Sequence, residues 1–405
     1  MRYERRRIVT LPLRGVRVLD LSIYLAGPYG SQMLGDLGAE VIKIETPGKG
    51  DLSRNMPPYF VKGFSAYFLG FNRNKKSITL NLKSAEGKQI FFELVKKADV
   101  VLDNFRHGVR ERLGIDYEKC REANPRIISC SISGFGQSGP YRDRPALDLI
   151  IQAMGGAMSY TGEECGDPVR MGVPIGDLGG GLFAVPGILA ALYQREKTGV
   201  GQNIDISLLD AQVALHTYRT QYYFIGGEIP VPIGSGHVSG VPIRAFKAKD
   251  GKYVVIDAVV DRLWSALCDA IGYPELKEDP RYATMSGRFE HRKVLYSLLE
   301  EVFLTKTRDE WVEIFSEMGV AGGPIKTLDE VVVDPQVLHR RMIVEMDHPI
   351  CGKLKVTGNP IKLSGSNEEA FEPHPALGQH TQEILSDVLG YSSEKIEVLN
   401  KAKVI

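Results

Sequence analysis

The sequence contains few cysteines, and their spacing excludes the usual roles of cysteine in folding. The five residues, Cys120, Cys130, Cys165, Cys268 and Cys351, are odd in number and widely separated, and no two form a Cys-x-x-Cys pair. This pattern argues against a disulfide framework and against a zinc site. We therefore expect no bound metal, and a reducing, cytoplasmic setting.

An excess of charge and long apolar runs are also absent. The chain has 50 Lys plus Arg and 50 Asp plus Glu, so its formal net charge is +0, whereas nucleic-acid binders usually show a basic excess. No stretch approaches the roughly 18–20 uncharged apolar residues of a membrane span. The first residues, MRYERRRIVTLPLRG, lack the apolar segment of a secretory signal. We expect no nucleic-acid partner, no membrane association and no leader.

Common nucleotide and hydrolase motifs are missing too. The turn after the first predicted strand reads Leu25-Ala26-Gly27-Pro28-Tyr29-Gly30, which is not a Gly-x-Gly-x-x-Gly fingerprint. There is no P-loop, no Gly-x-Ser-x-Gly elbow with plausible partners and no His-Glu-x-x-His motif. The sequence therefore does not indicate a nicotinamide dinucleotide, and we expect no permanently bound cofactor.

The sequence does contain a regular alternation of strands and helices over its first half. A length of 405 residues suggests two or three structural units. Short apolar stretches typical of buried strands alternate with segments of helical periodicity, which predicts an α/β fold with a mostly parallel sheet covered by helices. The predicted strands are 17–22, 40–45, 77–82, 99–104, 126–133 and 203–208, and the predicted helices include 28–37, 109–113 and 181–196.

The pattern changes near Tyr222. Residues 226–242 are rich in Gly, Pro and Ser and have no hydrophobic period, which is typical of a linker or mobile loop. A hairpin around Asp250-Gly251 and three amphipathic helices follow. We therefore predict a large Rossmann-like domain over 1–222, a linker and small α+β domain over 223–334, and a return segment over 335–405 that completes the large domain.

Asp177 is the first candidate for chemistry. It lies among glycines in Pro174-Ile175-Gly176-Asp177-Leu178-Gly179-Gly180-Gly181, just before a predicted helix. Glycines would let a ligand approach the backbone, and free N–H groups at a helix start can hold an oxyanion. These features suit a carboxylate nucleophile. The alternative is an ordinary aspartate that caps the helix.

Three loops are candidates for ligand binding. The first loop either binds phosphates or is a solvated, charged loop, and it contains Asn72, Arg73, Asn74 and Lys75. The second loop follows the carboxyl end of a predicted strand and contains Asn104, Phe105 and Arg106, with Arg112 nearby. Open α/β sheets bind ligands at such ends, so this loop either binds a ligand or forms a simple capping turn. Gly234, Gly236 and His237 belong to a loop that is either a lid over a reaction centre or a plain linker.

In their order along the chain, these segments resemble the family III CoA-transferases. The resemblance is carried by Gly15–Asp20, Ala26-Gly27-Pro28, Leu37–Glu45, Asn104-Phe105, Gln152–Gly156, Gly176-Asp177 and Gly378–Thr381. It implies that Asp177 is the nucleophile and that a CoA thioester and small carboxylic acids are the substrates. It also implies an interlocked homodimer. The family's CoA site would match Leu25, Ala26, Asn72, Arg73, Asn74, Lys75, Asn104, Phe105, Arg106 and Arg112, with Gly234, Gly236 and His237 in the lid.

The resemblance also implies a mechanism, in which CoA moves through an aspartyl anhydride and an aspartyl-CoA thioester. Residues 166–170 favour a donor like succinyl-CoA. The family also contains α-methylacyl-CoA racemases, which use a His just before an Asp, but Leu147-Asp148 stands here and leucine cannot exchange a proton. Asp148 either supports the site or caps a helix. Racemase activity and non-catalytic CoA binding are kept as alternative functions.

Overall fold

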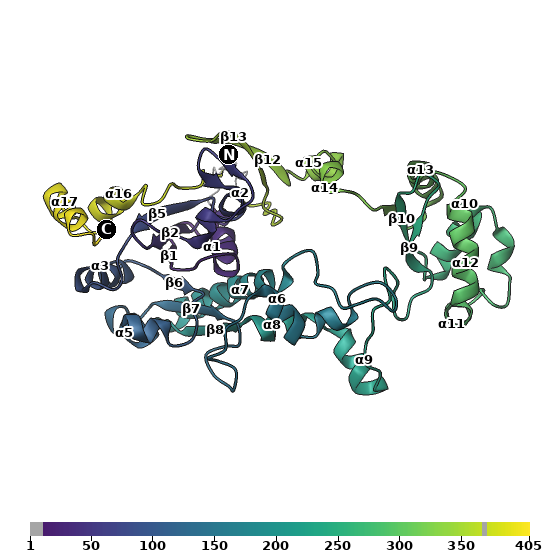
Figure 1. The fold of residues 1–405 in the computed structure, drawn as a ribbon, viewed down its shortest axis with the longest axis horizontal. Coiled ribbons are helices and arrows are strands. Elements are labelled where there is room, and N and C mark those ends of the chain that lie inside the picture. The colour runs from purple at the N-terminus through teal and green to yellow at the C-terminus, as the bar shows by residue number, and fades with distance from the viewer. Residues whose placement is uncertain (1–10, 367–370) are drawn as a thin grey trace, which may run out of the picture. The chain divides into compact units, whose positions relative to one another are not determined.

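The computed structural model describes residues 11–366 and 371–405, which form two compact units (Figure 1). The first unit contains residues 11–157, 170–226 and the described part of 336–405. The second contains Met158–Val169 and Gly227–Pro335. The chain thus enters the second unit twice, and its first visit, Met158–Val169, falls within the segment that the sequence assigns to the large domain.

A six-stranded parallel sheet forms the centre of the first unit, as predicted. Its strand order is β5-β2-β1-β6-β7-β8, and every neighbouring pair is parallel. The order reverses between β1 and β6, which is the doubly wound arrangement that places ligands at this switch point. The strands are β1 (Arg17–Asp20), β2 (Glu40–Glu45), β5 (Lys75–Thr79), β6 (Val100–Asp103), β7 (Ile128–Ser133) and β8 (Asn203–Ser207).

Both faces of the sheet are covered by helices because both faces of the strands are apolar. In β1, Val18 belongs to one hydrophobic cluster and Leu19 to the other, as successive residues of a strand point to opposite faces. One layer contains α1 (Ala26–Asp36), α6 (Asp148–Met154), α7 (Ile175–Thr198) and α8 (Leu208–Leu215). The other contains α3 (Ala85–Val95), α5 (Tyr117–Ala123), α16 (Thr381–Asp387) and α17 (Ser393–Lys401).

The C-terminal segment adds two helices to the core of the first unit. Ile384 and Leu385 of α16 and Ile396 and Leu399 of α17 are buried in the same cluster as the sheet. The segment also forms an antiparallel hairpin that the sequence analysis missed. The remaining elements of the first unit are η1 (Leu52–Asn55), β3 (Phe60–Val61), β4 (Phe64–Ser65), α2 (Ala66–Leu69), α4 (Val109–Leu113), α9 (Tyr218–Gly226), β12 (Ile343–His348) and β13 (Gly352–Thr357).

The second unit is a three-stranded antiparallel sheet packed with helices around its own core. Its sheet order is β11-β10-β9, and its core includes Trp264, Phe303 and Trp311. The predicted hairpin and helices are present, but the short β11 was not predicted. Its elements are β9 (Ile243–Lys247), β10 (Tyr253–Asp257), α10 (Asp261–Ile271), η3 (Pro274–Lys277), α11 (Met285–Glu290), α12 (Arg292–Phe303), α13 (Arg308–Met318), β11 (Gly322–Pro324) and α14 (Leu328–Val331). Two short elements, η2 (Ala157–Tyr160) and α15 (Pro335–His339), lie where the chain passes from one unit to the other.

Helix α7 is longer and more apolar than the sequence analysis allowed. Within the described residues it is the one helix that is long and apolar enough to cross a membrane by length and composition. Half of its most apolar stretch is buried, and Ala184, Val185 and Ile188 pack in the cluster between the sheet and α1. These are the properties of the core helix of an α/β layer, so the apolar composition of α7 is explained by packing.

Candidate active site

Asp177 lies inside the first turn of α7, which begins at Ile175 and not after the glycine run. The glycines permit close helix packing, which differs from the role that the sequence suggested. A Cβ at Gly181 would lie 2.6 Å from the Ala26 carbonyl oxygen of α1, and one at Gly176 would lie 2.9 Å from Oδ1 of Asp148. The glycines therefore bring α7 against its neighbours and do not expose its backbone to a ligand at these positions.

Asp148 holds the start of α7 from a neighbouring helix. Its Oδ1 accepts hydrogen bonds from the backbone N–H groups of Gly176 at 2.9 Å and of Asp177 at 3.2 Å. Asp148 is the first residue of α6, whose N-cap is Leu147, and the N-cap of α7 is Pro174. Neither aspartate is thus the cap of its own helix. The α7 N–H groups expected to hold an oxyanion instead bind the Asp148 carboxylate.

This environment makes the Asp177 carboxylate less acidic than usual. Burial and, second, the negative charge of Asp148 raise the pKa of Asp177 from 3.8 to about 6. Burial also raises the pKa of Tyr67 on α2, and Asp177 and Asp148 add to this effect, so the Tyr67 hydroxyl lies in the field of both carboxylates. At neutral pH Asp177 is therefore mainly ionised but poorly solvated, which is the state that a carboxylate nucleophile requires.

The predicted residues at the strand ends come together at the switch point. Leu25 and Ala26 are buried where α1 follows β1. Asn104, which follows β6, joins the two loops because its Oδ1 accepts the Ile23 N–H at 2.9 Å and its Nδ2 donates to the Ile23 carbonyl at 2.7 Å. The loops after β1 and β6 thus form one rigid edge of the crevice where doubly wound sheets bind ligands.

Phe105 and the two arginines lie on the β6 side of this crevice. Phe105 is half-buried and packs against the core, while Arg106 and Arg112 are exposed. Phe105 and Arg106 line a pocket of about 190 Å³, together with the buried Arg110. Arg110 forms an ion pair with Asp103 at 3.1 Å, so its charge is already balanced within the fold. The exposed arginines are the better placed cations for an anionic ligand.

The segment of Asn72, Arg73, Asn74 and Lys75 is largely buried, so it is not a solvated loop, and its contact with phosphate stays a prediction. The first three residues precede β5 and Lys75 is its first residue, whereas ligands of open α/β sheets bind beyond the carboxyl ends of strands. Its side chains are used internally, so a contact with phosphate would require an exchange of these partners. The Arg73 guanidinium donates to Asp36 at 2.6 and 3.0 Å, and Asn74 Nδ2 donates to the same carboxylate at 2.7 Å. Asn72 Nδ2 donates to the Phe68 carbonyl at 3.1 Å. Lys75 Nζ donates to Asp20 at 3.2 Å, to the Pro28 carbonyl at 2.8 Å and to Asn72 Oδ1 at 2.9 Å.

The predicted lid belongs to the second unit. Gly234 donates its N–H to the Gly162 carbonyl at 2.9 Å. The Nδ1 atom of His237 accepts N–H groups of its own loop from Ser239 at 3.3 Å and Gly240 at 3.1 Å. His237 therefore has a role in shaping the loop, and its part in covering a reaction centre stays a prediction.

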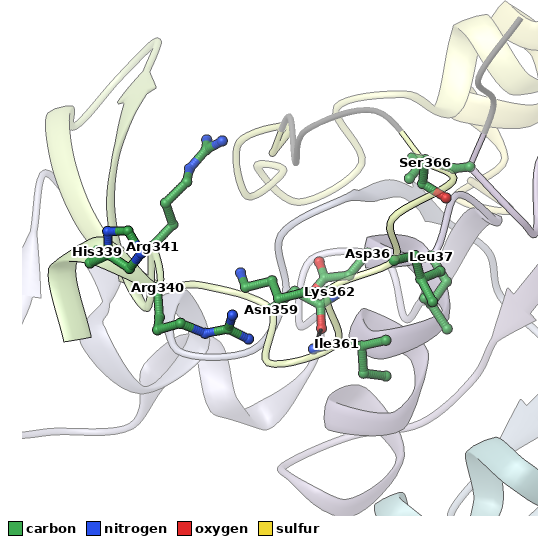
Figure 2. A pocket seen from close by; sticks show the side chains of 11 residues that line it. Asp36, Leu37, His339, Arg340, Arg341, Asn359, Ile361, Lys362 and Ser366 are labelled. Atoms are coloured by element: carbon green, nitrogen blue, oxygen red, sulfur yellow. Dashed lines mark hydrogen bonds between the residues drawn. The ribbon is translucent and has the colours of Figure 1, made fainter. Parts of the chain in front are cut away.

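A second pocket of about 250 Å³ lies between the end of α1 and residues 339–366 (Figure 2). None of the residues predicted for the site lines it. Its lining combines apolar side chains with Arg340, Arg341 and Lys362, and its one carboxylate, Asp36, is bound to Arg73. In the described part of the chain, no group of His, Cys, Asp and Glu has the arrangement of a metal site.

Comparison with known proteins identifies the family of the chain. The model of CoA-transferase family III matches residues 13–381. Succinyl-CoA:glutarate CoA-transferase of Mus musculus is 44% identical over 97% of this chain and 90% of its own length. Succinyl-CoA–D-citramalate CoA-transferase of Chloroflexus aurantiacus is 39% identical over 97% of this chain and 98% of its own length.

The solved structures agree at the level of the fold. The crystal structure of a CAIB/BAIF family protein from Brucella suis superposes with a TM-score of 0.84 and 37% identity, covering 94% of this chain and 100% of that one. The family match covers most of the chain, and the relatives named above are CoA-transferases. The chain therefore belongs to CoA-transferase family III and is a CoA-transferase.

Proposed function

We propose that the enzyme transfers CoA from an acyl-CoA to a free carboxylic acid through covalent intermediates on Asp177. One observation carries this proposal: Asp177 is a poorly solvated carboxylate whose pKa is raised to about 6, and no cation is among the groups that act on it. A structural aspartate at such a position would usually be paired with a cation or would accept hydrogen bonds. An unpaired, partly desolvated carboxylate is a competent nucleophile.

The proposed reaction consists of two displacements at the donor and two at the acceptor. An Asp177 carboxylate oxygen attacks the thioester carbonyl carbon, the C–S bond breaks, and a CoA thiolate and a mixed anhydride form. The thiolate attacks the Asp177 carbonyl of the anhydride, which releases the donor acid as a carboxylate and leaves an aspartyl-CoA thioester. The acceptor carboxylate attacks this thioester and releases the thiolate, and the thiolate then takes the acceptor acyl group and frees Asp177.

We place CoA along the switch point, with Leu25, Ala26 and Asn104 at its edge and Arg106 and Arg112 near its phosphates. The intermediates hydrolyse readily, so the site must exclude water. A succinyl-CoA-like donor is favoured because the similar enzymes of Mus musculus and Chloroflexus aurantiacus are named for succinyl-CoA. The acceptor is a small mono- or dicarboxylic acid.

We also propose that the working enzyme is a homodimer with interlocked subunits. Helix α9 has no buried residue, and Tyr222, Tyr223, Phe224 and Ile225 on it are exposed large hydrophobic side chains. Such a concentration of apolar surface is typical of a surface that a protein partner covers. Light scattering that gives the mass of one chain would contradict this assembly.

The proposed reaction is tested by mass spectrometry of CoA species in deuterated water. The protein is incubated with succinyl-CoA and a pool of free carboxylic acids, and new acyl-CoA thioesters are expected. Asp177→Asn should remove them while circular dichroism stays unchanged, whereas Asp387→Asn, at an exposed aspartate on α16, should not affect transfer. Undiminished transfer by Asp177→Asn would rule out the nucleophile. Deuterium on the acyl chain without new thioesters would indicate racemisation, which the exposed Leu147 beside Asp148 does not favour.

A further inference from the structure

Gln152 on α6 is fully buried, and its side-chain amide connects two segments near the nucleophile. Its Nε2 donates to Oδ2 of Asp148 at 2.8 Å, and its Oε1 accepts the backbone N–H of Met171 at 2.9 Å. The other carboxylate oxygen of Asp148 accepts the N–H groups of Gly176 and Asp177. A single amide is therefore joined to the first turn of α7 by two routes, through Asp148 and through Met171.

The hydrogen bonds of Gln152 lie where the chain returns to the first unit. After α6 the chain leaves the first unit at Ala157, and it returns at Arg170, one residue before Met171. Asp177 lies only six residues beyond Met171, so the segment that carries the nucleophile starts at this point of return. Gln152 holds the backbone at the beginning of that segment, and Asp148 holds it at the end.

We propose that Gln152 is a positioning residue for Asp177, which fixes the segment 171–176 and keeps the Asp148 carboxylate oriented toward the start of α7. This inference rests on the proposed role of Asp177 as the nucleophile. The two functions require a group that donates to a carboxylate and accepts from a backbone N–H at the same time. A neutral amide does both, whereas an ionised carboxylate cannot donate and an apolar side chain can do neither.

Misplacement of the nucleophile should affect the chemical step more than substrate binding. Loss of the amide leaves the N–H of Met171 and one oxygen of Asp148 without this partner, and such losses commonly reduce a rate by about 10-fold to 100-fold. Gln152 bonds to Asp148 and Met171, and neither is among the residues that we propose to bind CoA. We therefore expect the KM for succinyl-CoA to change less than about 3-fold.

The test compares Gln152→Met and Gln152→Glu with a matched control. Gln212 of α8 is also buried and packs beside the end of α6 near Gly155, and within the described residues it makes no hydrogen bond to Asp148 or Met171. Gln212→Met thus removes a buried amide from the same layer without breaking the connection. For all proteins, kcat and KM with succinyl-CoA are measured from pH 5.5 to 8.5, and folded protein is quantified by circular dichroism.

We expect Gln152→Met to lose kcat by about 10-fold to 100-fold, while Gln212→Met stays within about 3-fold of the parent enzyme. Gln152→Glu should regain activity at the acid end, because a protonated carboxyl has one donor and one acceptor and can replace the amide. The inference is overturned if Gln152→Met keeps the parental kcat, or if Gln152→Glu is as impaired as Gln152→Met at pH 5.5.

A covalent-intermediate measurement separates this inference from the proposed function. After rapid mixing with succinyl-CoA, the peptide that contains Asp177 is examined for a bound CoA adduct. An adduct that forms on the same peptide but more slowly in Gln152→Met supports both claims. An adduct that forms at the parental rate in Gln152→Met refutes the positioning role alone. No adduct on this peptide in the parent enzyme, together with transfer by Asp177→Asn, refutes the nucleophile, and the positioning role falls with it.

Discussion

Replacing Asp148 by asparagine should move the acid limb of the pH–rate profile toward lower pH. In the free enzyme, the rise of kcat/KM with pH should report ionisation of Asp177, whose pKa is about 6. Burial is the larger cause of the raised pKa and the charge of Asp148 is the second, so Asp148 accounts for the smaller part of the rise. Removal of this charge makes Asp177 easier to ionise, and the limb should then lie below pH 6, while burial still keeps it above the ordinary pKa of 3.8.

The same substitution should lower the plateau of the profile. The asparagine oxygen can still accept the N–H groups of Gly176 and Asp177, but its amide nitrogen would face the Nε2 donor of Gln152. We expect kcat at pH 8 to fall by about 10-fold. The assay is succinyl-CoA turnover from pH 4.5 to 8.5, with Asp210→Asn as a control at an exposed aspartate in the same helical layer. An acid limb that stays in place or moves to higher pH would refute the electrostatic reasoning.

Two further predictions concern stability. Gly181→Ala should reduce the free energy of unfolding in urea by about 1–3 kcal/mol, since the new Cβ would lie 2.6 Å from the Ala26 carbonyl oxygen, whereas Gly226→Ala, with open space around it, should have little effect. His374 is 1% exposed, and burial lowers its pKa from 6.5 to about 3. The unfolded chain therefore binds a proton below pH 6.5 that the fold does not, so this residue should cost about 1.4 kcal/mol of stability between pH 7.5 and 5.5. Thermal and urea unfolding of His374→Phe should lack this part of the pH dependence, and an equal dependence in both proteins would contradict it.

Most strands and helices of the first unit could be predicted because each is marked by the pattern of apolar residues within its own segment. The strand 40–45 matches β2 and the segment 109–113 matches α4 without any change of bounds. Buried parallel strands are apolar on both faces, and the glycine and charged residues between them mark where they end. The hairpin of β12 and β13 was missed, since its strands are largely exposed and carry Glu, Lys and Asp among their apolar residues.

The site was harder to predict because its connections link distant positions. Asp177 was found from its glycine setting and from the resemblance to a family. The bond from Asp148 to the start of α7 joins residues 28 and 29 positions apart, with a visit to the second unit between them. Periodicity carries no information about such a contact. Gln152 likewise entered the sequence analysis only as part of the resemblance, in Gln152–Gly156, and its bonds to Asp148 and Met171 are visible only in the fold.

The segment 72–75 shows that a sequence also does not reveal which charged side chains are paired within the fold. Arg73 and Lys75 have the composition of a phosphate-binding segment, but their partners, Asp36 and Asp20, lie 37 and 55 residues away. A sequence shows where charges are, and it does not show which of them are already neutralised. Contact of this segment with phosphate therefore stays a prediction, and it would require Arg73 and Lys75 to exchange these partners.

The arrangement around Asp177 also indicates how one carboxylate can both place and tune another. The start of a helix carries a partial positive charge, which would ordinarily stabilise an ionised aspartate in its first turn and lower its pKa. In this enzyme Asp148 accepts two N–H groups of that turn and adds a negative charge of its own. The helix start therefore gives Asp177 a fixed backbone position without lowering its pKa, and the carboxylate remains basic enough to attack a thioester near neutral pH. Because these donors are occupied, the charge that develops on the thioester oxygen must be stabilised by other groups, and the Tyr67 hydroxyl, whose pKa is raised by burial and by the charge of Asp177, is one candidate.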